Sequence, residues 1–186
     1  MSTPRLDPIL PEDRTEYQQQ LMDAAGRDFR VFSTLVRHPD LFGAYLPLGT
    51  RLLARSLLTP REREILILRA AYGIRAEYEW GHHAKIAATS GVEDDVIAEI
   101  GTPQPQLAAE DALLIRAADE LVDDHRLSQQ TWDTLSQRFG DMQLIEICML
   151  VGAYAMLGAT LNSLQVQLED GYPTAPWLSD PDERGV

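Results

Sequence analysis

The segment that most constrains this fold is the apolar run at residues 144–161, in which Glu146 is the only charged residue. A run of this length is either a membrane span or a helix that is buried on most of its sides. Acidic residues flank it, with Asp141 before it and Glu169 and Asp170 after it, and no basic stop signal follows. We therefore expect a helix buried within the protein or between subunits, and no membrane partner.

Small side chains lie along the same run. Gly152, Met156 and Ala159 fall at helical spacing, with Ala155 and Gly158 beside them. Because side-chain size sets how closely two helices approach, this pattern favours tight packing against a second helix. That helix can belong to the same chain or to another subunit.

Apolar residues at helical spacing dominate the rest of the sequence, and no stretch alternates like a strand between hairpin turns. We therefore predict an all-α protein. Helices are expected over residues 16–37, 39–54 with a break at Pro47, 60–72, 76–90, 93–100, 108–123, 128–139, and then to about residue 168.

The clearest helix start lies at residues 59–62. Thr59 can cap the helix, Pro60 suits the first helical position, and Glu62 can close a capping box. Gly73 marks the expected end of this helix.

The length of 186 residues suits one domain with a sizeable core. Residues 1–14 are Pro-rich and expected to be extended, and residues 15–169 form the expected single helical domain. Residues 170–186 are Pro-rich and acidic, so we expect an arm or a disordered tail there.

The charge balance narrows the function. With 16 Lys and Arg against 29 Asp and Glu, the net charge is −13, which disfavours binding to nucleic acid and to anionic membranes. Cys148 is the only cysteine, and the first residues have no apolar core like that of a secretory signal. We expect a cytoplasmic protein that acts on a small molecule.

The sequence also contains an internal echo. Residues 64–72 align without gaps to residues 146–154, which places Glu64 on Glu146 and Tyr72 on Tyr154. Two related helical halves are therefore expected. The polar residues that come after residues 64–72 have no counterparts after residues 146–154. We therefore expect any chemistry to lie in the first half.

Glu64 is the first candidate for that chemistry. On a helix, Ile67, Leu68 and Ala71 share its face, so the carboxylate is surrounded by apolar groups. A buried carboxylate needs a hydrogen bond, an opposite charge or a metal, or else it keeps its proton. A structural ion pair to Arg69 or Arg75 is the alternative.

Glu79 and His83 are the second candidate, because residues four apart share a helix face. A carboxylate beside an imidazole can hold it in one tautomer, which suits a general acid or base. Tyr78, Trp80 and His82 lie on adjacent faces and either line a pocket or simply pack. An ordinary surface pair is the alternative for Glu79 and His83.

A metal centre is a further alternative. Residues 79–82 match the Glu-x-x-His spacing of di-iron bundles, but no second such motif occurs in the sequence. A mononuclear site from Glu64, Glu79 and His83 is chemically possible. We assign no metal ligand and expect no cofactor.

These motifs together resemble the carboxymuconolactone decarboxylase and alkylhydroperoxidase D-like (AhpD-like) superfamily. Three segments carry the resemblance: residues 58–69, 78–87 and 91–97. The resemblance implies an all-helical, AhpD-like fold that assembles as a homo-oligomer, a trimer or a hexamer, with active sites between helices or subunits.

The peroxidase branch of that superfamily carries a Glu, a Cys-x-x-Cys pair and a His. Glu64 and His83 take the Glu and His positions here, whereas the two cysteine positions hold Ala76 and Glu79. A disulfide cycle needs two thiols, and Cys148 alone cannot form a pair within one chain. The resemblance therefore excludes a thiol peroxidase and points to the branch without cysteines.

The decarboxylase side of the superfamily implies loss of carbon dioxide or proton transfer on a small lactone, keto acid or aromatic-pathway intermediate. His83 would be the proton donor or base, with Glu79 orienting it and Glu64 tuning the charge. His82, Tyr78 and Trp80 would contact the substrate. A metal-dependent enzyme and a non-catalytic ligand-binding or assembly protein are the alternatives. The non-catalytic alternative predicts that an Arg pairs with Glu64 and that no cavity reaches His83.

Overall fold

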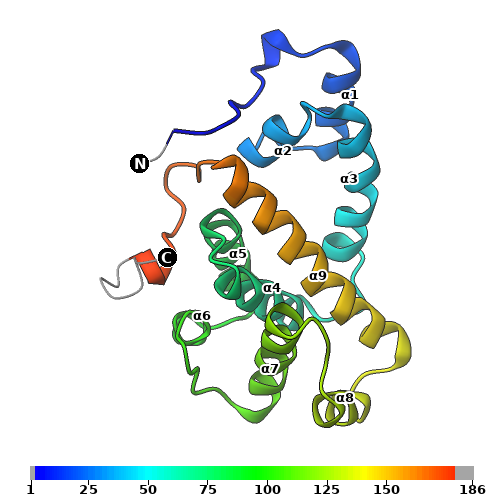
Figure 1. The fold of residues 1–186 in the computed structure, drawn as a ribbon, viewed down its shortest axis with the longest axis vertical. Coiled ribbons are helices and arrows are strands. Elements are labelled where there is room, and N and C mark those ends of the chain that lie inside the picture. The colour runs from blue at the N-terminus through cyan, green and yellow to red at the C-terminus, as the bar shows by residue number, and fades with distance from the viewer. Residues whose placement is uncertain (1–2, 179–186) are drawn as a thin grey trace.

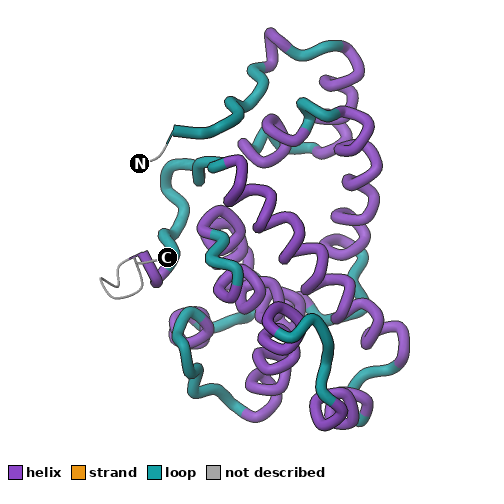
Figure 2. Tube along the Cα trace, viewed as in Figure 1, coloured by secondary structure: helices purple, strands orange, loops and turns teal. Residues whose placement is uncertain are grey.

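The computed structural model describes residues 3–178, and within that range it contains nine α-helices, two short 3-10 helices and no strand. This confirms the all-α prediction, and Figure 2 shows helices joined by short loops. The helices are α1 (Glu16–Ala25), α2 (Arg30–Leu35), α3 (Pro39–Ala54), α4 (Pro60–Gly73), α5 (Glu77–Thr89), α6 (Asp94–Ile100), α7 (Ala109–Asp123), α8 (Gln129–Ser136) and α9 (Asp141–Leu164).

Helix α4 is the centre of the fold. It packs against α5, α6, α7 and α9, and every residue from Glu64 to Tyr72 is buried. Residues 64–72 are mostly apolar and are buried on every side of the helix, which requires neighbouring helices all round α4 (Figure 1). The helices α1, α2 and α3 form a separate group at the top of this view, beside the end of α9.

The predicted start of α4 is confirmed. The Thr59 hydroxyl accepts a hydrogen bond from the Glu62 backbone N–H, and the Glu62 carboxylate accepts one from the Thr59 N–H. The chain leaves α4 through Arg75, whose backbone is left-handed with a φ of 54°, and enters α5 at Glu77. This tight connection sets α4 and α5 side by side.

Two helix predictions near the N-terminus were wrong. The helix expected over residues 16–37 is two helices, because the chain turns at Gly26, where the φ of 72° is one that glycine adopts readily. The break expected at Pro47 does not occur, since α3 continues through it. Proline removes one helical hydrogen bond there without ending the helix.

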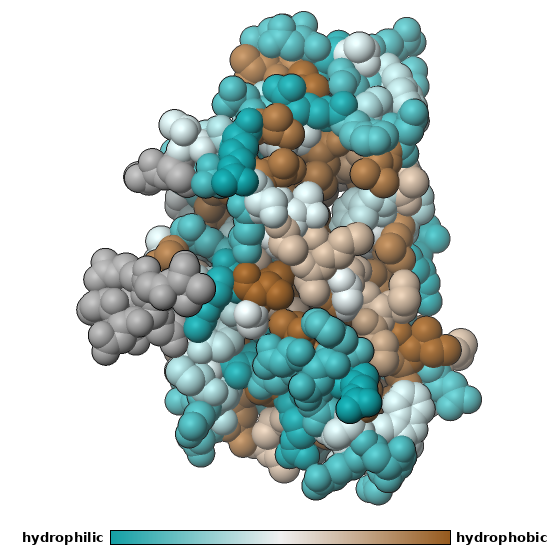
Figure 3. Space-filling view, viewed as in Figure 1, coloured by the Kyte–Doolittle hydropathy of each residue, from teal (hydrophilic) through white to brown (hydrophobic). Residues whose placement is uncertain are grey.

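Helix α9 carries the apolar run and has two different faces. Leu144, Ile147, Leu150 and Leu161 are buried against the other helices. The opposite face is exposed at alternating intervals of three and four residues, and apolar side chains gather over the course of α9 in Figure 3. We call this exposed set the α9 stripe: Met142, Ile145, Met149, Gly152, Met156, Ala159 and Ser163.

Within residues 3–178, α9 is the one helix long and apolar enough to cross a membrane. The core helix of a soluble protein passes the same test, and α9 packs against α3, α4, α5, α7 and α8.

Each of the two segments of the internal echo lies within a single helix. Residues 64–72 lie in α4 and residues 146–154 in α9, and these two helices pack together. Helix α4 then ends and a second helix follows, whereas α9 continues to Leu164. The two matching segments therefore form a packed pair of helices, and the chain takes a different course after each of them.

Both terminal segments lie against the helices. The N-terminal segment bonds to the end of α9 through the Arg5 N–H, which donates to the Leu164 carbonyl. After α9, residues 165–178 run back across α5, and we call this stretch the C-terminal strap. Trp177 in the strap is buried between Tyr72 and Trp80. Up to residue 178 the predicted tail is thus an ordered arm, and residues 179–186 lie outside the described range.

Candidate active site

A cavity of about 850 Å³ lies between α1–α3 on one side and α5 and α9 on the other. Four of the six predicted site residues line it: Tyr78, Glu79, His82 and His83. Glu64 lies directly behind His83, and Trp80 faces elsewhere. The cavity is large enough for a small organic molecule, which fits the expectation of a small-molecule substrate.

Glu64 holds His83 from behind. Its Oε2 lies 2.7 Å from His83 Nδ1, and its Oε1 accepts a hydrogen bond of 2.9 Å from Arg63 Nε. Burial favours the neutral acid, but the hydrogen bond and charge of His83 and the neighbouring Arg63 outweigh it and hold the pKa of Glu64 below its ordinary value. Glu64 is therefore an anion that fixes the orientation of the imidazole ring.

Glu79 lies on the other side of the same ring. Its Oε2 is 3.7 Å from His83 Nε2, and its side chain is almost fully buried. Burial raises the pKa of Glu79 to about 7, an effect that the charge of His83 only partly offsets. The sequence predicted that Glu79 orients His83, whereas the distances give that position to Glu64. Glu79 is instead poised to gain or lose a proton near neutral pH.

A second histidine–carboxylate pair lies next to the first. His82 Nε2 is 2.6 Å from Oε2 of Glu169, a residue of the C-terminal strap. Glu169 Oε1 also accepts hydrogen bonds from the Tyr78 hydroxyl and the Arg30 N–H. Burial opposes ionisation, but these bonds outweigh it and lower the pKa of Glu169 to about 2.

Aromatic rings sandwich His82. The Tyr78 ring stacks on one face at 4.6 Å and the Tyr172 ring on the other at 4.2 Å. Tyr78 and Tyr172 also line the cavity. The strap therefore contributes one wall of the site, and nothing in the spacing of the sequence pointed to Glu169 or Tyr172.

Gly81 makes this close approach possible. A Cβ atom at Gly81 would lie 2.6 Å from Leu168 Cδ2 and 2.9 Å from the Pro173 carbonyl oxygen. The second distance is to backbone, which cannot move aside as a side chain can. Glycine at this position lets the strap lie directly on α5.

Trp80 does not belong to the site. Its indole packs at right angles against the buried Trp177 ring, and the side of the helix that it occupies faces Gly101 rather than the cavity. The placement of Trp80 among substrate-contacting residues is therefore corrected: its role is to anchor the strap.

Two tyrosines that the sequence did not single out as site residues line the cavity. Tyr45 comes from α3, and Tyr154 comes from α9 with its ring at right angles to His83 at 4.9 Å. Tyr154 appeared in the internal echo, but nothing in the sequence marked Tyr45.

Three cationic side chains also border the cavity: Arg27, Arg63 and Lys85. These side chains carry the positive charge that an anionic substrate would need. Arg69, which the sequence offered as an ion-pair partner of Glu64, instead binds Asp119 and the Ile100 and Thr102 carbonyls.

The arrangement does not favour a metal site. Glu64 and Glu79 approach opposite nitrogens of His83, so the three side chains do not converge on one point. Within the described part of the chain, no group of three or more His, Cys, Asp and Glu side chains has the geometry to hold a metal ion.

Comparisons with known proteins agree with this fold. The model of the carboxymuconolactone decarboxylase family matches residues 39–119, which include Glu64, Glu79 and His83. Residues 39–119 of this chain are therefore similar to that family, and the fold of the chain is AhpD-like. No curated protein sequence matches it.

Several solved structures share the AhpD-like fold. An uncharacterised peroxidase-related protein with an alkylhydroperoxidase AhpD core, from Ralstonia eutropha, has a TM-score of 0.73 at 18% identity, with coverage of 91% of this chain and 95% of that chain. A peroxidase-related protein from a Silicibacter species has a TM-score of 0.71 at 16% identity, with coverage of 92% of both chains. A debrominase in complex with 2,3,4-tribromopyrrole has a TM-score of 0.68 at 18% identity, with coverage of 91% and 94%.

The two positions that hold cysteines in AhpD-like peroxidases have different surroundings here. Ala76 is fully buried and packs against Gly158 of α9, where an added Cβ atom would lie 2.8 Å from the Ala76 Cβ atom. Glu79 lines the cavity. In this chain, a small packed side chain thus occupies one of the two positions and an ionisable carboxyl group occupies the other.

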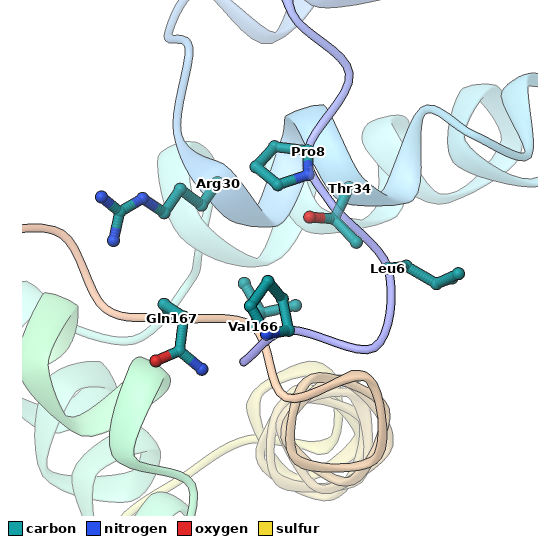
Figure 4. Close-up of a pocket in the computed structure, with 7 residues that line it drawn as sticks. Leu6, Pro8, Arg30, Thr34, Val166 and Gln167 are labelled. Atoms are coloured by element: carbon teal, nitrogen blue, oxygen red, sulfur yellow. The ribbon is translucent and has the colours of Figure 1, made fainter. Parts of the chain in front are cut away.

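A second, smaller cavity of about 210 Å³ lies between the N-terminal segment, α2 and the start of the strap (Figure 4). Leu6, Pro8, Thr34 and Val166 contribute to its lining. Arg30 also lines it, and its guanidinium donates to the Leu168 carbonyl. None of its lining residues is an acid or a histidine, so we place the chemistry in the larger cavity.

Proposed function

We propose that this protein is a cofactor-free enzyme that decarboxylates, or transfers a proton on, a small lactone, keto acid or aromatic-pathway intermediate. The observation that carries the proposal is Glu79. It lines the cavity, it is buried, its pKa is raised to about 7, and it faces a histidine whose other nitrogen is held by an anion. A carboxyl group with such a pKa is well suited to general acid–base catalysis near neutral pH.

The proposed reaction follows from these positions. The bond between the substrate's α carbon and its carboxylate breaks, carbon dioxide leaves, and the electron pair delocalises into the adjacent carbonyl as an enolate. The neutral Glu79 carboxyl then donates its proton to the α carbon and becomes an anion. His83, which Glu64 orients, lies beside Glu79 to return a proton from solvent. His82 and Tyr78 line the same cavity as candidate substrate contacts.

A thiol peroxidase cycle does not fit this chain. Cys148 is the only cysteine of the sequence, it lies on α9 rather than in the lining of the cavity, and burial raises the pKa of its thiol. A raised pKa lowers the fraction of reactive thiolate.

If the protein were non-catalytic, Glu64 would pair with an Arg and no cavity would reach His83. Arg63 does pair with Glu64, but the cavity reaches His83. The open cavity and the raised pKa of Glu79 favour the enzyme.

We further propose that the protein acts in the cytoplasm as a homo-oligomer, a trimer or a hexamer. The α9 stripe supports this, because an exposed apolar face with heptad-like spacing is typical of helices that pair. The net charge of −13 supports a partner list without nucleic acid.

The test is carbon dioxide release from carboxymuconolactone and a panel of β-keto and lactone acids. Wild type is compared with His83→Ala and Glu79→Gln, and with Glu12→Gln, an exposed acid far from α5, as the matched control. Release by wild type and the control, lost in both site variants, supports the proposal. No release from any acid by wild type, or full activity of both site variants, contradicts it.

A further inference from the structure

Two tyrosine hydroxyl groups in the candidate active-site cavity take no part in the proposed proton transfer. Tyr45 of α3 and Tyr154 of α9 both line the cavity that contains Glu79 and His83. Neither hydroxyl has a hydrogen-bond partner among residues 3–178, whereas the Tyr78 hydroxyl in the same cavity bonds to both Glu169 and Val31. Their hydroxyl groups are therefore available to a ligand.

The position of Tyr154 relative to the proton-transfer residues is fixed by packing. Its ring meets the His83 ring edge to face at 4.9 Å, and its side chain is almost fully buried. The charge of Glu79 acts on both phenols, and Tyr45 also acts on Tyr154, so the three groups lie within electrostatic range of one another. Three helices, α3, α5 and α9, thus contribute polar groups to the same cavity.

Both phenols remain hydrogen-bond donors over the physiological pH range. Burial raises the pKa of Tyr154 well above its ordinary value, and the charges of Glu79, Tyr45 and Glu64 raise it further. Burial and the charge of Glu79 raise the pKa of Tyr45 in the same way. A neutral phenol donates a hydrogen bond, and preorganised donors in a partly dry cavity stabilise a developing negative charge.

We propose that Tyr45 and Tyr154 form an oxyanion-binding site, in which both hydroxyls donate hydrogen bonds to the oxygen atom of an enolate while Glu79 protonates its carbon. This inference rests on the proposed function and narrows its substrate class. The substrate carries a carbonyl or ring oxygen conjugated to the carbon that loses carbon dioxide, because only then does the charge reach the phenols.

The test uses an oxyanion that does not react. The probe is 4-nitrophenol, whose anion absorbs visible light, titrated at about pH 6, where Glu79 is mostly protonated. Wild type is expected to bind the anion and to increase its visible absorbance. Because hydrogen bonds to charged groups contribute about 1.5–3 kcal/mol each, Tyr45→Phe and Tyr154→Phe should each weaken binding about 10- to 100-fold.

The matched control is Tyr72→Phe, which removes the hydroxyl of a buried tyrosine outside the cavity, and it should bind within about twofold of wild type. Circular dichroism and melting temperatures confirm that each variant folds. No anion binding by wild type, or binding by both site variants within about twofold of wild type, overturns the proposal. Weakening in one variant alone overturns the two-donor arrangement. Carbon dioxide release is measured separately, so anion binding without turnover contradicts the proposed reaction and leaves the oxyanion site supported.

Discussion

Glu64 Oε2 lies 2.7 Å from His83 Nδ1, so a carboxylate of the central helix decides which nitrogen of the histidine faces the cavity. The other nitrogen, Nε2, is the one near Glu79. The two carboxylates differ in charge for a physical reason. Glu64 has two cationic or donor partners that favour its anion, whereas the burial of Glu79 favours its neutral form. This separation of pKa values divides the work between an orienting anion and a proton donor.

Removing the charge of Glu64 should loosen the site and destabilise the fold. Glu64→Gln keeps an acceptor for one partner but leaves Arg63 without its counter-charge, so we expect the free energy of unfolding to fall by about 1–3 kcal/mol. Glu64→Ala should lower it by about 3–5 kcal/mol, because it breaks a buried ion pair. Urea denaturation of both variants measures these losses. A Glu64→Ala protein as stable as wild type would show that the pair contributes nothing.

The reaction should depend on the protonation of Glu79. If its neutral carboxyl donates the proton, the rate is constant below about pH 7 and falls about tenfold for each pH unit above it. Glu79→Gln should lower the rate about 100-fold or more, since an amide cannot supply the proton. Carbon NMR of the glutamate carboxyl groups titrates Glu79 without any substrate. A titration midpoint near the ordinary value of 4.5 would rule out this role.

Burial of Glu79 should also make stability depend on pH. Its folded pKa of about 7 lies above the unfolded value of 4.5, so the folded state binds more protons between these values. Stability from this group is therefore fully present below about pH 4.5 and decreases by about 3 kcal/mol as the pH rises to about 7. Glu79→Gln removes this slope. The difference between the two unfolding free energies, followed from about pH 5 to about pH 8, isolates the effect, and parallel curves would contradict it.

Trp177 should anchor the C-terminal strap. Its buried ring packs on Tyr72 and Trp80, and truncation of a buried aromatic residue costs about 3–5 kcal/mol. We expect Trp177→Ala to lower the melting temperature strongly, and Leu178→Ala, at the exposed next position, to have little effect. Calorimetry compares the two variants. Equal melting temperatures would mean that the strap contributes little to the stability of the helices.

The α9 stripe should be the contact between subunits. Its first half carries Met142, Ile145 and Met149, and its second half carries mostly small residues, so two antiparallel copies would set large side chains against small ones. Met149→Lys should therefore lower the mass measured by light scattering to that of a monomer. Gln130→Lys, on the exposed face of α8, should leave it unchanged. A wild-type monomer would contradict the prediction directly.

Local signals in the sequence predicted the fold well. The capping box at Thr59 and Glu62 and the apolar periodicity of α4 both depend on residues within a few positions, so they can be read from the chain. The left-handed turn at Gly26 was missed because glycine occurs in many other settings. The resemblance assigned Glu64 and His83 to one site, and in the structure Glu64 lies 2.7 Å from His83 Nδ1, closer than Glu79 at 3.7 Å from Nε2.

The remaining parts of the site depend on contacts between distant segments. Tyr45 reaches the cavity because α3 lies across from α5, and Glu169 reaches His82 because the strap returns over α5 after α9. The spacing of residues in the sequence does not predict contacts between segments that are so far apart. Trp80 was misplaced for the same reason, since its partner Trp177 lies almost a hundred residues later.

Gly81 has a consequence for the size of the molecules that this cavity admits. Any side chain there would push against the backbone at Pro173, and the strap would have to move away from α5 together with Tyr172. The cavity wall that Tyr172 forms would open, and His82 would lose the Tyr172 ring that stacks on it. The size of the residue at position 81 thus determines how close the strap lies to α5 and how wide the cavity is. A larger residue at this position is a way to obtain variants that accept bulkier molecules.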